Sequence, residues 1–293
     1  MKHAFLNSEN IEDYTKTPAP KSVNRQALKP LDSNCTPATQ TSQESAGYST
    51  QIHRFLRRTE NSPVPDYMIN QKELSATMRS ILIDWLAAVH QKYKFDSETL
   101  FLCVQILDRY LSEVEVAKSE LQLVGGAALL IASKYEEIYC LSAGSIAYLT
   151  DQAYTKSEVL LAERTILKQL QYKLTSPSCF RFFERYRCLA DLNEKERSLG
   201  MYLLELSLLD YNMLKYKASL VAAGALYLSR KIFSNLSWSE FLIKETGYTT
   251  CELKNCAKDL LVLYQKSSTG SYTSLYKKYS QIENFNVANT KLT

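Results

Sequence analysis

The sequence lacks the residue spacings that build zinc sites and disulfide frameworks. None of its seven cysteines forms a Cys-x-x-Cys pair, and its three histidines lie far apart, at positions 3, 53 and 90. We therefore expect no metal ion and a reducing compartment. A glycine-rich phosphate loop and a nucleophile motif are missing as well, so the sequence indicates neither an enzyme nor a bound cofactor.

Long apolar runs and blocks of one charge are also missing. The longest apolar stretch, near 123–132, is much shorter than the roughly 20 residues that a membrane-spanning helix needs, and the start, MKHAFLNSEN, has no signal-peptide core. The formal charge of +4 is small, and basic residues cluster only as pairs such as Arg57-Arg58. We expect a soluble intracellular protein that binds neither membrane nor nucleic acid.

Proline is almost absent from most of the chain. Six of the seven prolines fall at or before Pro65, and residues 1–47 are rich in Ser, Thr, Asn, Gln and Pro and poor in aromatic residues. Such a composition is typical of a disordered tail. From Tyr48 onward helical periodicity dominates and no alternating strand is evident, which predicts an all-α body. The seventh proline, Pro177, marks a candidate boundary between two domains.

Two segments of the body resemble each other. The segment LVGGAALLIASKY at 123–135 matches LVAAGALYLSRKI at 220–232, at a spacing of 97 residues. This spacing exceeds the roughly 20–50 residues of a solenoid repeat, so it predicts duplication of a whole domain of about five helices. Each small-residue helix is apolar on every side, which predicts a central position with close neighbours. The predicted division is a tail at 1–47, a helix and linker at 48–74, domains at 75–175 and 176–280, and a C-terminal tail at 281–293.

Two charged residues stand where helical periodicity calls for apolar ones. Lys134 continues an apolar stripe that contains Ile131, and Glu163 lies between Leu160 and Ile166 on another stripe. Charges that are partly removed from water must be paired. Two interpretations are open: a structural ion pair between Lys134 and Glu163, which the residue pattern alone favours, or docking of both groups on the main chain of a partner protein.

The segment MRSILIDWLAAVHQKY carries two apolar stripes. One contains Met78, Ile81, Leu82, Trp85 and Val89, and the other contains Ile83, Leu86 and His90 together with Arg79. Two stripes exceed what one-sided packing requires, so this helix is either wholly buried, which the pattern favours, or lines a groove for another protein. Arg79 needs an acid, and Asp108 is the candidate for an ordinary core ion pair.

In combination, several segments resemble the cyclin box of A-type and B-type mitotic cyclins. They are MRSILIDWL, LDRYLS, LQLVGGAALLIASKYEEIY, TDQAYTKSEV and LLELSLLDYNMLKY, and the similarity covers roughly Tyr48 to Lys278. SKYEEIY and LLDYNM are B-like, whereas SWSEFLIKETGYT is A-like. The resemblance implies two tandem five-helix cyclin-box repeats after a short N-terminal helix. It also implies a regulatory subunit that activates a cyclin-dependent kinase at the G2/M transition, in nucleus and cytoplasm.

The resemblance also implies a kinase-binding face, and it reverses the preference for a purely structural ion pair. In the family, the residues matching Lys134 and Glu163 bond main-chain groups beside the C helix of the kinase. The surrounding contacts match Tyr135, Glu136, Ile138, Tyr172 and Leu174, and an N-terminal helix that also touches the kinase matches Tyr48, Ile52 and Phe55. Such a face binds only the kinase conformation in which the C helix is rotated inward. Binding therefore raises the population of that conformation and allows phosphoryl transfer.

Two further family sites are implied. The stripe Met78, Ile81, Leu82 and Trp85, with Gln122, matches a groove for Arg-x-Leu motifs of substrate or inhibitor proteins. Ala88 stands where the family often has an acid, and Cys140 and Leu141 replace the usual proline after EEIY. In the tail, RQALKPLDSN resembles a destruction box read by a ubiquitin ligase, with Arg25, Leu28 and Leu31 at its defining positions and Ser33 where the family prefers Asn.

Other protein classes fit less well. A general transcription factor with cyclin-like repeats would need a zinc ribbon and a basic face, and neither is visible. A transcription-type cyclin is a nearer relative, but MRSILIDWL and the destruction-box-like tail argue against it. A catalytic phosphotransferase lacks the necessary parts. Thr17-Pro18, Thr36-Pro37 and Ser62-Pro63 are candidate proline-directed phosphorylation sites, or simply turns.

Overall fold

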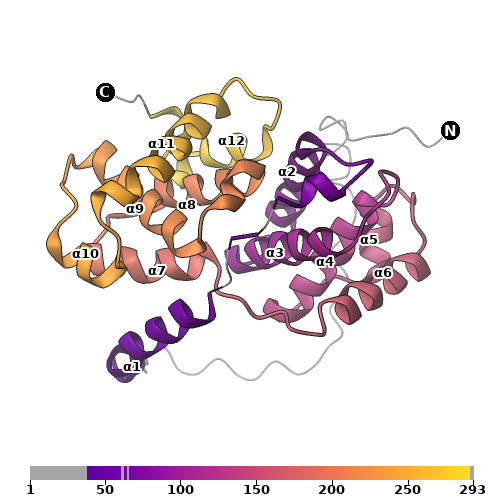
Figure 1. The fold of residues 1–293 in the computed structure, drawn as a ribbon, viewed down its shortest axis with the longest axis horizontal. Helices are drawn as coiled ribbons and strands as arrows, with labels where there is room; N and C mark the ends of the chain where they lie inside the picture. Colours follow the sequence, from indigo (N-terminus) through magenta and orange to yellow (C-terminus); the bar gives the residue numbers. More distant parts are fainter. Residues whose placement is uncertain (1–37, 61–62, 65, 291–293) are drawn as a thin grey trace. The chain divides into compact units, whose positions relative to one another are not determined.

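The computed structural model describes residues 38–60, 63–64 and 66–290. The chain divides into two compact units, residues 1–58 and 59–293, which we describe separately. The first unit contains nearly all of helix α1 (Ala38–Thr59), which begins before the predicted boundary at Tyr48. The predicted destruction box lies outside the described residues. In the part of the chain that is described, every regular element is a helix, so the predicted all-α fold is confirmed there (Figure 1).

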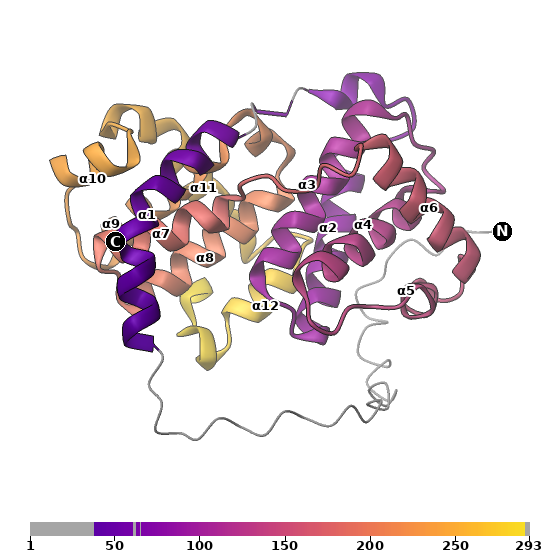
Figure 2. The same ribbon diagram turned by 90° about the horizontal axis from the view of Figure 1, so that it is seen from below.

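The first repeat lies in the second unit and contains five helices. They are α2 (Ala76–Tyr93), α3 (Ser97–Glu113), α4 (Leu121–Glu136), α5 (Ala143–Leu149) and α6 (Lys156–Gln169), and the short 3-10 helix η2 (Tyr67–Asn70) precedes them. Side chains of Ser75, Asp96, Ser142 and Thr155 cap the first backbone N–H groups of their helices. Helix α4 contacts the other four helices, which confirms its predicted central position (Figures 1 and 2).

The second repeat has the same order of helices. It comprises α7 (Cys179–Ala190), α8 (Glu194–Leu209), α9 (Ala218–Phe233), α10 (Glu240–Thr246) and α11 (Thr250–Ser267), with the 3-10 helix η3 (Tyr211–Lys215) between α8 and α9. Pro177 lies directly before Ser178, the N-cap of α7. A further helix that the sequence analysis did not separate, α12 (Ser274–Tyr279), packs against α2 and α8, and the short turns η4 (Ile282–Asn284) and η5 (Val287–Asn289) follow it.

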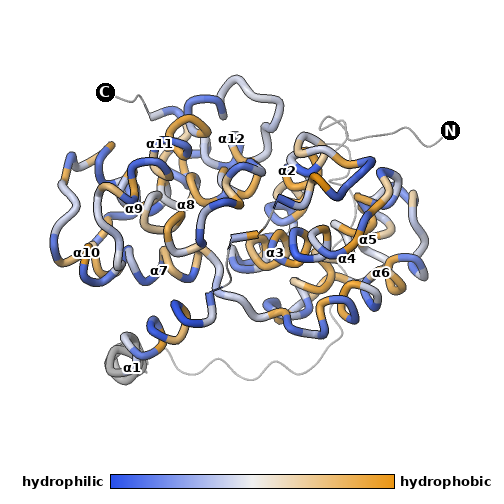
Figure 3. Tube along the Cα trace, in the orientation of Figure 1, coloured by the Kyte–Doolittle hydropathy of each residue, from blue (hydrophilic) through white to orange (hydrophobic). Residues whose placement is uncertain are grey.

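Small residues let the central helices approach their neighbours closely. A Cβ atom on Gly125 would lie 2.7 Å from Cδ1 of Leu82, and one on Gly126 would lie 2.8 Å from Cγ2 of Ile146. These distances are shorter than ordinary carbon contacts of about 3.5–4.0 Å. The predicted close packing of the small-residue helix is therefore confirmed. Figure 3 shows hydrophobic residues along α3 and α4, and most of the apolar side chains of these two helices are buried.

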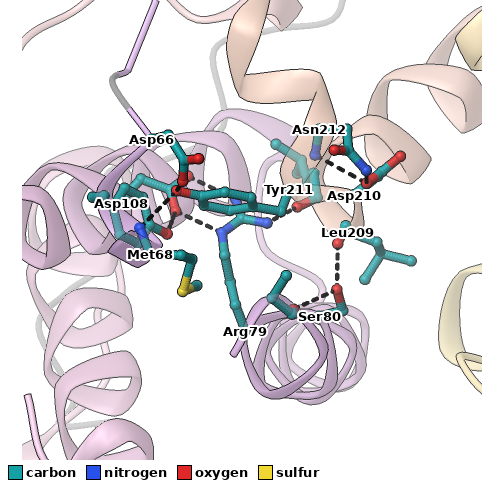
Figure 4. A network of polar contacts seen from close by, with 12 residues as sticks. Asp66, Met68, Arg79, Ser80, Asp108, Leu209, Asp210, Tyr211 and Asn212 are labelled. Atoms are coloured by element: carbon teal, nitrogen blue, oxygen red, sulfur yellow. Dashed lines mark hydrogen bonds and ion pairs between the residues drawn. The ribbon is translucent and has the colours of Figure 1, made fainter. Parts of the chain in front are cut away.

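A buried polar network joins the two repeats (Figure 4). The guanidinium of Arg79 donates to both carboxylate oxygens of Asp108 at 2.7 Å, and its Nη1 donates to the carbonyl of Leu208 at 2.9 Å. Beside it, the hydroxyl of Ser80 donates to the carbonyl of Leu209 at 2.6 Å. The pair Arg79 and Asp108 is thus the core ion pair that the sequence suggested, and it also ties α2 and α3 to the end of α8.

Candidate protein-docking face

The charged end of α4 meets α6 at the surface. Lys134, in the last turn of α4, donates from Nζ to Oε1 of Glu163 at 2.6 Å. The Lys134 side chain is 44% exposed and the Glu163 side chain 12% exposed. An ammonium group has three donors and a carboxylate can accept several bonds. The pair therefore exists as a structural ion pair, and it still presents hydrogen-bonding groups to a partner.

Exposed aromatic and aliphatic side chains surround this pair. Tyr135, Ile138 and Tyr172 are 50%, 92% and 68% exposed, whereas Glu136 and Leu174 are half-buried. They come from the end of α4, from the loop after it and from the loop after α6. The Tyr135 hydroxyl forms a hydrogen bond with Oγ1 of Thr175, which joins the end of α4 to the loop after α6. Clustered apolar exposure of this kind marks interaction surfaces.

We call this surface the α4–α6 face. It comprises Lys134, Tyr135, Glu136, Ile138, Glu163, Tyr172 and Leu174. Each of these residues was a predicted site residue, and the structure places them on two helices and two adjoining loops of one repeat. The central helix α4 stays buried up to Ser133 and reaches the surface at Lys134, which explains the abrupt change from apolar to charged residues in the sequence.

The second repeat adds residues beside this face that sequence reasoning missed. Arg181 of α7 lies 3.8 Å from a carboxylate oxygen of Glu136 and 3.5 Å from one of Glu98, which also accepts a hydrogen bond from the Ser178 hydroxyl at 2.9 Å. Burial raises the pKa of the Glu98 carboxyl to about 7, although the Ser178 hydroxyl and the Arg181 guanidinium act in the opposite direction. Glu98 lies in the first turn of α3, two residues after the capping Asp96, so its sequence position resembles that of an ordinary helix-start acid.

The loop after α6 has a backbone conformation that the sequence did not predict. Gln171 and Tyr172 have φ angles of 51° and 58°, in the left-handed region. Non-glycine residues visit this region uncommonly. The carbonyl of Lys173, the next residue, accepts a hydrogen bond from Nη1 of Arg109 on α3 at 2.7 Å.

The predicted N-terminal contact residues lie in the other compact unit. Tyr48, Ile52 and Phe55 are spaced by four and three residues on α1, so they share one side of that helix, and all three are exposed. Whether they extend the α4–α6 face stays a prediction.

The predicted groove residues differ in their exposure. Leu82 and Trp85 are buried, and Leu82 packs against the backbone of Gly125. Met78, Ile81, Ala88 and Gln122 are half-buried. Leu82 and Trp85 therefore fit the prediction that this helix is buried. The accessible part of the predicted groove is limited to Met78, Ile81 and Gln122.

The described residues form neither a cluster of metal ligands nor a membrane-spanning helix. Among the described residues, no group of three or more His, Cys, Asp or Glu side chains is arranged to hold a metal ion. Over the same part of the chain, no helix is both long enough and apolar enough to cross a membrane.

Comparisons with known proteins identify relatives. The model of the cyclin N-terminal domain matches residues 51–175, and that of the cyclin C-terminal domain matches residues 177–292. Cyclin-A2 of Xenopus laevis is 38% identical over 246 residues, which cover 83% of this chain and 59% of that protein. The G2/mitotic-specific cyclin-B of Hydra viridissima is 38% identical over 236 residues, which cover 80% of this chain and 60% of that protein.

The chain thus spans about three fifths of the length of these two relatives. Among solved structures, a viral cyclin from herpesvirus saimiri superposes with a TM-score of 0.62 at 21% identity, covering 78% of this chain and 98% of that chain. At this identity the likeness shows a shared fold.

Proposed function

The chain belongs to the cyclin family, with relatives among the A-type and B-type mitotic cyclins, and we propose that it binds and activates a cyclin-dependent protein kinase. Cyclins are regulatory subunits and not catalysts. The observation that carries the proposal is the partly exposed ion pair between Lys134 and Glu163, framed by exposed Tyr135, Ile138 and Tyr172. An ordinary structural ion pair needs no such apolar frame.

The chemistry of the α4–α6 face suits main-chain recognition. The Lys134 ammonium can donate to a carbonyl oxygen of the partner, while the Glu163 carboxylate can accept from a backbone N–H. Because both groups already hold each other, neither must be ordered at the moment of binding, which lowers the entropic cost. Hydrogen bonds to charged groups contribute about 1.5–3 kcal/mol each.

Activation follows from selective binding. The face is built on the packed helices α4 and α6, so we propose that it has one shape and that this shape fits a kinase whose C helix is rotated inward. A ligand shifts a two-state equilibrium by its difference in affinity for the two states, and a shift from about 1% to about 99% active requires a difference of about 5.5 kcal/mol. The completed lysine–glutamate pair of the kinase then supports phosphoryl transfer.

Finer features of the proposal rest on family resemblance. We propose that the chain acts at the G2/M transition, in nucleus and cytoplasm, because its relatives include a G2/mitotic-specific cyclin. The half-buried Met78 and Ile81 would receive the leucine of Arg-x-Leu motifs in substrates or inhibitors, with weaker preference for basic motifs because position 88 is alanine. The tail residues Arg25, Leu28 and Leu31 would be read by a ubiquitin ligase.

A reconstitution assay tests the proposal. The purified chain is mixed with each of several cyclin-dependent kinases, and phosphorylation of a peptide substrate is measured. We expect at least one kinase to gain about 100-fold in rate, since its active fraction rises from about 1% toward completion. The chain alone should transfer no phosphate. If no kinase of the panel gains activity while circular dichroism shows a helical chain, the proposed function is wrong.

A further inference from the structure

The turn that carries Tyr172 is held in an unfavourable backbone conformation. Helix α6 ends at Gln169, and Gln171 and Tyr172 both have positive φ angles. Residues other than glycine pay of order 1–3 kcal/mol for such sparsely populated conformations, which persist only where the surroundings fix them. The backbone bonds from Tyr172 N to Leu167 O and from Lys173 N to Leu170 O, both at 2.9 Å, secure the start of the turn.

A side chain from a different helix secures its far end. Arg109 of α3 is half-buried, and its Nη1 donates to the carbonyl of Lys173 at 2.7 Å. The preceding residue, Asp108, is buried and receives two hydrogen bonds from Arg79, so the backbone that carries Arg109 is fixed in the core. The guanidinium group is planar and rigid, so it retains little conformational freedom once one of its N–H groups is hydrogen-bonded.

A second contact acts at the end of the loop. The hydroxyl pair of Tyr135 and Thr175 joins the loop to the end of α4. Tyr172, 68% exposed, and the half-buried Leu174 lie close in sequence to these two attachment points. The loop therefore presents an aromatic ring at a defined place although its own backbone would favour other conformations.

We propose that Arg109 is a positioning residue of the α4–α6 face, which fixes the left-handed turn at 171–172 through the carbonyl of Lys173 and thereby orients Tyr172 for the partner. This inference rests on the proposed kinase-binding function. Arg109 itself need not touch the kinase. Without its hydrogen bond, the turn would relax toward ordinary φ angles and Tyr172 would sample several positions, so binding would have to order it again.

A double-mutant cycle tests this role. Arg109→Met, which keeps an unbranched apolar stem, is made in the unmodified chain and in Tyr172→Ala. Calorimetry then measures the affinity of each form for a kinase that the chain activates in the reconstitution assay. We expect Arg109→Met to weaken binding about tenfold in the wild-type chain and less than about twofold in Tyr172→Ala, because residues that act through one another are strongly non-additive. Arg109→Lys, which can still donate to the carbonyl, should restore part of the loss.

Two controls separate positioning from general damage. Arg230→Met alters a half-buried arginine of the second repeat and should leave affinity unchanged. Hydrogen exchange should rise at the amides of 171–175 in Arg109→Met, with α4 and α6 still protected. If Arg109→Met unfolds the chain, Arg109→Gln, which shortens the side chain and keeps it polar, takes its place in the same cycle.

The outcomes are distinct. Equal losses in both backgrounds, or no loss in either, would overturn the positioning role of Arg109 while leaving kinase binding intact. Failure of the unmodified chain to bind any kinase would instead overturn the proposed function itself.

Discussion

The first and second repeats each bury an acid at the same point of their second helix. Asp108 of α3 and Glu205 of α8 lie 97 residues apart, the same spacing that separates the starts of α4 and α9. Their side chains are 4% and 1% exposed. Both acids are therefore removed from water, and each must find a cation and hydrogen-bond donors within the fold.

The partners of these two acids lie on opposite sides of them in the sequence. Asp108 is bound by Arg79 and by the Tyr67 hydroxyl, from elements that precede it. Glu205 is bound by Nζ of Lys278 at 2.6 Å and by the Tyr279 hydroxyl at 2.8 Å, from the C-terminal helix α12. Each repeat thus has a buried acid at the same position, but the cation of Asp108 comes from α2 of the first repeat, whereas that of Glu205 comes from α12, which follows the second repeat.

The surface of the two repeats differs more than the core. Lys231 on α9 stands 97 residues after Lys134, but its Nζ donates to Asn235 at 2.8 Å. Counted from the capping threonines of α6 and α11, the position of Glu163 is occupied by Ala257. Of the two repeats, only the first therefore has a lysine and glutamate pair that joins its third and fifth helices at this place. The second repeat lacks the matching pair, so the proposed docking surface is built on the first repeat.

Replacing the cation of each buried acid should lower the free energy of unfolding by different amounts in the two repeats, and this is the largest difference that we expect between them. Arg79→Met leaves Asp108 buried without its cation and also deprives the Leu208 carbonyl of a donor, so we expect a loss of about 3–5 kcal/mol in the free energy of unfolding. Lys278→Met should cost only about 2 kcal/mol, because the Lys278 side chain is 19% exposed and water can replace part of its bonds. Urea denaturation of both variants measures this, and a larger loss for Lys278→Met would contradict the comparison.

Replacing Glu98 should change the pH dependence of stability by a smaller amount. Its pKa is about 7 in the folded chain and near 4.5 when exposed, so the folded state binds more protons between these values. Stability from this group is therefore greatest below about pH 4.5, and it falls as pH rises toward 7. Glu98→Gln should remove that fall.

The second repeat supplies the control for this prediction. Lys195 occupies the position that corresponds to Glu98, and its side chain is exposed. Lys195→Gln should leave the profile of unfolding free energy against pH unchanged between pH 4.5 and 7. Identical profiles for Glu98→Gln and the unmodified chain, measured by thermal melts in buffers across this range, would show that Glu98 does not titrate there.

The sequence predicted features whose signal lies in side-chain type and spacing. Helical periodicity predicted the all-α fold, and a cation or an acid on an apolar stripe pointed to the pairs Arg79–Asp108 and Lys134–Glu163. The predicted limits of the domains stay predictions. The exposure of Leu82 could not be read from its stripe, since an apolar stripe looks the same whether it faces a core or a groove.

Other features carried no such signal. The acceptor for Arg109 is a backbone carbonyl, which every residue has, and the left-handed turn at 171–172 contains neither glycine nor asparagine to announce it. Glu205 finds its partner 73 residues away on a helix of six residues, too short for a periodic pattern. Long-range pairing of this kind depends on tertiary packing, which periodicity within one helix does not encode.

Calorimetric titration of an activated kinase into three forms of the chain tests the central claim most directly. The forms are the unmodified chain, Lys134→Ala combined with Glu163→Ala, and Lys231→Ala as the matched change in the second repeat. We expect the double variant to lose more than about 100-fold in affinity, as removal of two charge-assisted contacts requires, and Lys231→Ala to bind as the unmodified chain does. Undiminished binding by a helical double variant, or an equal loss from Lys231→Ala, would contradict docking through the α4–α6 face.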